Sequence, residues 1–146
     1  MRPNHLRLLT TLVALAGLAG TGCATAGLPS GITSNPLVSS LTSGLGVSPE
    51  QAVGGTGAMM GLAQSKLSPD QFGSITSAVP GLGDITKAAG PLLGSTPLNS
   101  LTNVQGAFSK LGMSQDMVGK FAPVIGDAIS KGGASQAAGL FTNLFK

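Results

Sequence analysis

The hydrophobic positions of the chain recur with helical spacing from residue 37 onward. Leu37, Leu41 and Leu45 fall on one face of a first predicted helix. Asn35-Pro36 supplies its N-cap and a proline at the first helical position, and Gly46 can end it in a left-handed cap. No stretch of useful length alternates apolar and polar residues as a strand does, so the pattern predicts an all-α fold.

Two segments share the strongest local signal for a helix start, Ser48-Pro49-Glu50-Gln51 and Ser68-Pro69-Asp70-Gln71. In each, the serine hydroxyl can accept from the glutamine backbone N–H while the glutamine side chain reaches back, which makes a capping box with proline at the first helical position. The expected core face of the first helix consists of Ala52, Thr56, Met59 and Ala63. That of the second, shorter helix consists of Phe72, Ile75 and Val79, and Pro80-Gly81 stops it.

Gly57 and Gly61 form a small-xxx-small pattern around Met59 and Met60. Such patterns mark close packing of helices in membranes. Because polar residues flank this one, we expect a contact between helices of a soluble domain instead. The two methionines are expected to fill the core.

The second half of the chain predicts a glycine- and proline-rich connector over residues 80–97, with one short helix at about Asp84 to Ala89. A helix that carries Leu98, Leu101, Val104, Phe108 and Leu111 then runs to Gly112. Ser114 is expected to cap the next helix, whose core face is Val118, Ala122, Ile125 and Ile129, and Lys131-Gly132-Gly133 ends it. A final helix carries Ala137, Leu140, Phe141 and Leu144. The pattern thus predicts one small domain over residues 35–146, built from five to seven short Gly-rich helices.

An internal repeat relates the two halves of this domain. Leu45-Gly46-Val47-Ser48 and Leu111-Gly112-Met113-Ser114 match at an offset of 66 residues, and the core faces that follow align under the same offset. One interpretation is a duplication that gives two helix-turn-helix halves. The other is that any helical hairpin uses such turns.

The N-terminus has the order of a bacterial export signal. Arg2 and Arg7 are basic, Leu8 to Ala19 is apolar, and the small residues Gly20-Thr21-Gly22 directly precede Cys23. This predicts a lipoprotein signal peptide over residues 1–22, with lipid attached to Cys23, and a flexible tether over residues 23–34. Two alternatives are ordinary cleavage after Ala24-Thr25-Ala26 and an uncleaved anchor, for which the apolar run is short.

Cysteine usage favours lipidation, because Cys23 is the only cysteine and would otherwise remain an odd thiol in an exported protein. Several acyl chains, such as palmitate, would anchor the protein firmly to a membrane. Ala24 follows Cys23, where an aspartate would suggest retention at the inner membrane. The expected location is therefore the outer membrane, facing the periplasm, with a periplasmic or secreted protein as the alternative.

Charge argues against nucleic acid as a partner. Arg2 and Arg7 leave with the signal, so six lysines remain against five acidic residues and the mature net charge is +1. The lysines are spread along the chain without a cluster, whereas a nucleic-acid surface needs a basic patch with stacking partners.

The residues that catalysis or metal binding would need are sparse. His5 is the only histidine and lies in the signal. This removes catalysis by Ser-His-Asp or Cys-His and removes histidine metal sites from the mature protein. Glu50, Asp70 and Asp116 are expected in first turns, where they interact with the helix dipole. We therefore expect no enzyme, no cofactor, no metal site and no catalytic residue, and Cys23 is the single site residue predicted.

The chain resembles the VcgC/VcgE-type bacterial domain of unknown function. The resemblance covers roughly Leu37 to Phe145. The best-matching stretches run from Leu45-Gly46-Val47-Ser48 to Leu67-Ser68, over Val79-Pro80-Gly81-Leu82, and from Leu111-Gly112-Met113-Ser114 through Val118 to Val124. It implies an exported helical domain and carries over no catalytic residue.

The expected function is a non-enzymatic interaction or structural module of the cell envelope, with a protein partner or a second copy of the chain. A membrane-active helical protein and a carrier of a small apolar ligand are the alternatives. A net charge of +1 gives little attraction to anionic lipid, which disfavours the first alternative.

Overall fold

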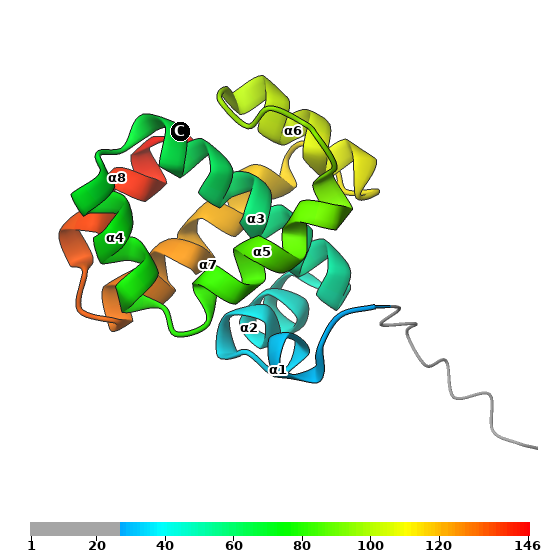
Figure 1. Ribbon diagram of the computed structural model, residues 1–146, viewed down its shortest axis with the longest axis horizontal. Coiled ribbons are helices and arrows are strands. Elements are labelled where there is room, and N and C mark those ends of the chain that lie inside the picture. The colour runs from blue at the N-terminus through cyan, green and yellow to red at the C-terminus, as the bar shows by residue number, and fades with distance from the viewer. Residues whose placement is uncertain (1–26) are drawn as a thin grey trace, which may run out of the picture.

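The computed structural model describes residues 27–146, which form eight helices and no strand (Figure 1). The helices are α1 (Ser30–Thr33), α2 (Pro36–Leu45), α3 (Pro49–Lys66), α4 (Pro69–Ala78), α5 (Leu82–Leu93), α6 (Leu101–Lys110), α7 (Met117–Lys131) and α8 (Ser135–Asn143). The all-α prediction is confirmed. The helices outnumber the expected five to seven because α1 forms a single helical turn within the predicted tether. None of the helices over residues 27–146 combines the length and apolar character of a membrane span.

The centre of the fold is α3, which contacts α2, α4, α5, α6 and α7 and runs through the middle of Figure 1. The predicted core face of α3 is confirmed, because Ala52, Thr56, Met59 and Ala63 are all fully buried. Burial extends beyond that face, since every residue from Ala52 to Met60 is buried. A helix that is covered on all sides belongs in the interior of a domain. The two methionines do fill the core, because Met59 and Met60 are both fully buried.

Glycine allows the neighbours of α3 to approach its backbone from several directions. A Cβ atom added at Gly57 would overlap the Cβ of Ala89 on α5, and one at Gly55 would lie 2.7 Å from a ring carbon of Phe121 on α7. Phe121 also packs edge-to-face on Phe108, with ring centroids 5.1 Å apart. Gly57 of the small-xxx-small pattern therefore serves a contact between helices of this domain, as expected, whereas Gly61 faces Leu98 in the segment between α5 and α6.

Both predicted capping boxes are present. Ser48 accepts from the backbone N–H of Gln51 at 3.2 Å, and the Gln51 side chain accepts from the Ser48 N–H at 3.0 Å. Ser68 and Gln71 form the same pair at the start of α4. Asn35 caps α2, as predicted.

The predicted cap at Ser114 was wrong. The helix α7 begins at Met117, its N-cap residue is Asp116, and no side chain caps it. The carbonyl of Ser114, and not its hydroxyl, accepts from the Met117 N–H at 3.0 Å. As a result, Asp116 precedes the first turn that it was expected to occupy, whereas Glu50 and Asp70 lie in first turns as predicted.

The predicted connector over residues 80–97 was also partly wrong, because most of it forms α5. Leu82, Ile85, Ala89 and Leu93 lie at helical spacing and are all buried. Burial of this face against α3 stabilises the helix, even though Gly83, Gly90 and Pro91 disfavour it locally.

The arrangement agrees with two helix-turn-helix halves. Gly46 and Gly112, which the offset of 66 residues aligns, have φ angles of 67° and 75°. Across the halves, α2 packs on α7 and α6 packs on α3. Gly55 faces Phe121, and the same offset aligns these two residues. The halves are thus related in their contacts as well as in their sequence, and α4 and α5 lie between them along the chain.

Candidate functional site

The predicted lipidation site, Cys23, and the predicted signal over residues 1–22 lie outside the described residues. The described chain begins at Gly27 and enters the domain through α1, which packs on α2 at one end of the fold (Figure 1). A chain of four residues spans at most roughly 14 Å. Cys23 precedes Gly27 by four residues in the sequence.

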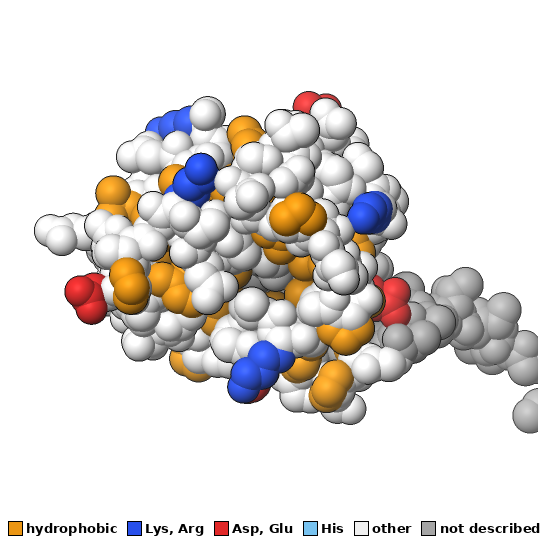
Figure 2. Space-filling view, turned by 45° about the horizontal axis from the view of Figure 1, so that its top comes forward, with side chains coloured by type: hydrophobic (Ala, Val, Ile, Leu, Met, Phe, Trp, Pro, Cys, Tyr) orange, Lys and Arg blue, Asp and Glu red, His pale blue; other side chains and the backbone are white. Residues whose placement is uncertain are grey.

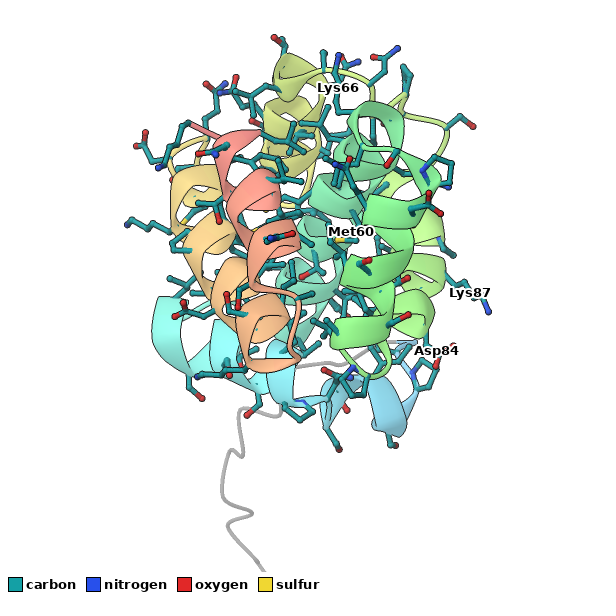
Figure 3. All side chains as sticks on the ribbon, turned by 90° about the vertical axis from the view of Figure 1, so that its left-hand side faces the viewer. Met60, Lys66, Asp84 and Lys87 are labelled. Carbon is teal, nitrogen blue, oxygen red and sulfur yellow. The ribbon has the colours of Figure 1, made fainter. Side chains whose placement is uncertain are left out.

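A hollow of about 740 Å³ lies beside this entry point, between the segment around α1 and the outer face of α5. We call it the α1/α5 hollow. Its apolar lining consists of Leu28, Pro29, Ile32, Ala88, Pro91 and Leu92. Asp84 and Lys87 on α5 also line it, and in Figure 3 Asp84 lies near the α1 end of the domain while Lys87 points outward from α5. The hollow is thus an apolar surface with two charged side chains.

The α1/α5 hollow exists because α5 has two apolar faces. One face, which includes Ile85 and Ala89, is buried against α3. The other carries Ala88 and Leu92, which are only half-buried. The sequence did not predict this site, because most of residues 80–97 were expected to form a connector. Two features of the sequence could have indicated this hollow. One is the helical spacing of residues 84, 88 and 92, and the other is that of Leu28 and Ile32.

A second hollow, of about 620 Å³, lies between α2, the end of α4 and α7. Its lining includes Leu37, Val79, Val124 and Ala128. Both volumes fall in the range of small-molecule sites, which is about 300–1,000 Å³. We call this one the α2/α7 hollow.

Asn35 forms part of the lining of both hollows. Its side-chain oxygen accepts from the Leu37 N–H at 3.0 Å, and its amide nitrogen donates to the Pro80 carbonyl at 2.9 Å. Gly81 makes room for this contact, because a Cβ there would lie 2.6 Å from the amide nitrogen of Asn35. The N-cap residue Asn35 therefore connects the start of α2 to the turn before α5.

Each hollow is lined by one acidic residue and one lysine, which are Asp84 and Lys87 in the α1/α5 hollow and Asp127 and Lys131 in the α2/α7 hollow. Within residues 27–146, no three of the His, Cys, Asp and Glu side chains lie close enough together to hold a metal ion. On the face shown in Figure 2, lysines and acidic residues are scattered singly. Ser65 and Ser109 directly precede lysines in the sequence. Their hydroxyls donate to the backbone carbonyls of Leu62 and Gln105, at 2.8 and 3.1 Å.

Comparison with known proteins identifies a family but no activity. Neither the curated proteins nor the solved structures compared with the chain give a match. Residues 19–144 match the family described as protein of unknown function VcgC/VcgE. This match includes both hollows' helices and most of the chain. The chain therefore belongs to the VcgC/VcgE family, as its resemblance suggested.

Proposed function

We propose that this protein is exported and lipid-anchored in the bacterial cell envelope, where its helical domain acts as a non-enzymatic interaction or structural module. The observation that carries the proposal is the order of Arg2 and Arg7, an apolar run, three small residues and Cys23. The outer membrane, facing the periplasm, is the proposed location.

The buried core that is described lies entirely after the predicted cleavage site. The buried core of the described residues begins at Leu37 and ends at Phe145. Cleavage before Cys23 would therefore leave that core complete, and a lipid on Cys23 would hold the α1 end of the domain next to the membrane. In the attachment step, the Cys23 sulfur forms a thioether to a diacylglyceryl group and loses its proton, while the donor phospholipid loses its headgroup.

The way in which the helices bury their apolar faces supports an interaction module over a membrane-active protein. The buried apolar residues of α5 and α7 pack on α3, and Leu140 is the one large hydrophobic side chain that is exposed among residues 27–146, at 41%. A protein that inserts into membranes needs an apolar face that is available to lipid.

Two measurements test the proposal. The intact protein should remain with membranes in high salt and be released by detergent, whereas the Cys23→Ala variant should not be membrane-bound. The predicted mature chain without the cysteine, residues 24–146, should be helical by circular dichroism and should leave a dye entrapped in anionic vesicles. Dye release at a low protein-to-lipid ratio would contradict the module and favour the membrane-active alternative.

A carrier of a small apolar ligand is the second candidate, and the two apolar hollows favour it. Mass spectrometry of the purified protein under native conditions distinguishes the two. A carrier should retain a non-covalent apolar compound in constant ratio to the protein, whereas a module should not.

A further inference from the structure

We propose that the α1/α5 hollow binds one acyl chain of the lipid on Cys23. This inference rests on the proposed lipid anchor. The occupant is part of the mature protein itself, and it would be attached four residues before Gly27, which lies in the lining of the hollow.

The first argument is chemical. The hollow is lined by aliphatic side chains from two segments, Leu28 and Ile32 on one side and Ala88 and Leu92 on the other. No aromatic ring is present in its lining, and its polar side chains are Asn35, which bonds to Leu37 and Pro80, and the exposed Asp84 and Lys87. Methylene groups need only this kind of surface, and they gain dispersion contacts when they fill it.

The second argument is one of shape. The short helix α1 packs on α2, and its contacts with α5 are few, so a space is left between α1 and α5 instead of a close helix contact. The volume of about 740 Å³ is that of a ligand site and not of a single missing side chain. A flat bilayer surface cannot fill such a hollow, whereas one flexible chain can.

The third argument is proximity. Because the chain between Cys23 and Gly27 spans at most roughly 14 Å, a lipid on Cys23 is always near the hollow. Binding of the acyl chain is then intramolecular, and a short linker gives it a high effective concentration. The α2/α7 hollow has a similar volume but lies on the other side of Asn35, and Gly27 is not part of its lining.

Photocrosslinking tests the proposal on the full-length gene product. Cells that express the protein are fed a long-chain fatty acid that carries a diazirine, and the mature protein is purified in detergent and irradiated. Photolysis releases dinitrogen, and the carbene inserts into a neighbouring C–H bond. Peptide mass spectrometry is expected to find the inserted chain on residues of the lining, such as Ile32, Ala88 and Leu92.

Two matched variants locate the occupant. Ala88→Phe places a ring in the α1/α5 hollow and should abolish these crosslinks. Ala128→Phe makes the same change in the α2/α7 hollow and should leave them intact. Circular dichroism of both variants checks that they are folded, and the unmodified protein gives the crosslink map without any substitution.

The outcomes separate this inference from the proposed function. A mature N-terminal peptide without lipid would overturn both. A lipidated peptide whose crosslinks go only to detergent, or to residues outside the lining, would overturn the hollow and leave the anchor. Loss of the crosslinks in Ala128→Phe but not in Ala88→Phe would place the chain in the other hollow and overturn the assignment.

Discussion

Substitution of Gly57 by alanine tests the packing at the centre of the fold. A Cβ at this position would lie less than 3.0 Å from the Cβ of Ala89, which is 1% exposed. Carbon atoms in contact prefer a separation of about 3.5–4.0 Å. Because the Cβ of alanine has no rotamer to change, the contact can be relieved only by moving α5 away from α3.

The magnitude follows from two opposing effects. Overpacking a well-packed core costs about 1–3 kcal/mol, and the obstructing atom here cannot rotate away, which favours the upper part of this range. Alanine is better than glycine inside a helix by up to about 1 kcal/mol. We expect a net loss of about 2 kcal/mol in the free energy of unfolding, which lowers the melting temperature of a domain of this size by about 6–10 °C.

Thermal and urea denaturation of residues 24–146, followed by circular dichroism, measures this loss. Gly106→Ala is the matched control, because Gly106 is exposed within α6 and an added Cβ meets no atom within 4 Å. It should be neutral or stabilising by up to about 1 kcal/mol. The double variant Gly57→Ala with Ala89→Gly moves the methyl group across the contact, so it should recover part of the loss. A stable Gly57→Ala single variant would refute the close approach of α3 and α5.

Three further predictions use the same denaturation assay. Gly132→Ala should lower the free energy of unfolding by more than about 2 kcal/mol, because the new Cβ would overlap the backbone carbonyl of Ala78, which cannot rotate aside. An unchanged denaturation midpoint would contradict the placement of the end of α4 against the end of α7. Ser48→Ala should lower the free energy of unfolding by about 0.5–2 kcal/mol, because it removes the capping box of α3. Ser114→Ala should change it by less than about 0.5 kcal/mol, because the Ser114 hydroxyl caps no helix. Equal losses in the two variants would show that both serines cap. Thr56→Val should stabilise by about 1 kcal/mol, because the hydroxyl of Thr56 is buried without a hydrogen-bond partner; a marked loss would reveal a partner for that hydroxyl.

The sequence predicted the elements whose signals are local. The capping boxes at Ser48 and Ser68 need only residues three positions apart, and proline at the first helical position fits a helix that is about to start. Ser114 lacks the second half of this signal, since Met117 occupies the position of the glutamine. That difference could have been read from the sequence.

The misses concern contacts between distant segments. Gly90 and Pro91 disfavour a helix locally, and only burial of α5 against α3 makes α5 favourable. The small residues of α3 likewise gave no direction for its neighbours, so the burial of every residue from Ala52 to Met60 could not be predicted. The α1/α5 hollow could not be predicted for the same reason. It forms on the face of α5 that does not pack on α3, so it exists only once α5 is helical and packed on α3.

The mass of the mature N-terminal peptide tests the central claim of a lipid anchor most directly. The protein is expressed in a bacterial host with its own N-terminus, purified from the membrane fraction in detergent and digested. The account predicts that the first peptide begins at Cys23 and carries the mass of a diacylglyceryl group or of a more highly acylated form. A peptide that begins at Gly27 without added mass would contradict it and would indicate ordinary cleavage after Ala26.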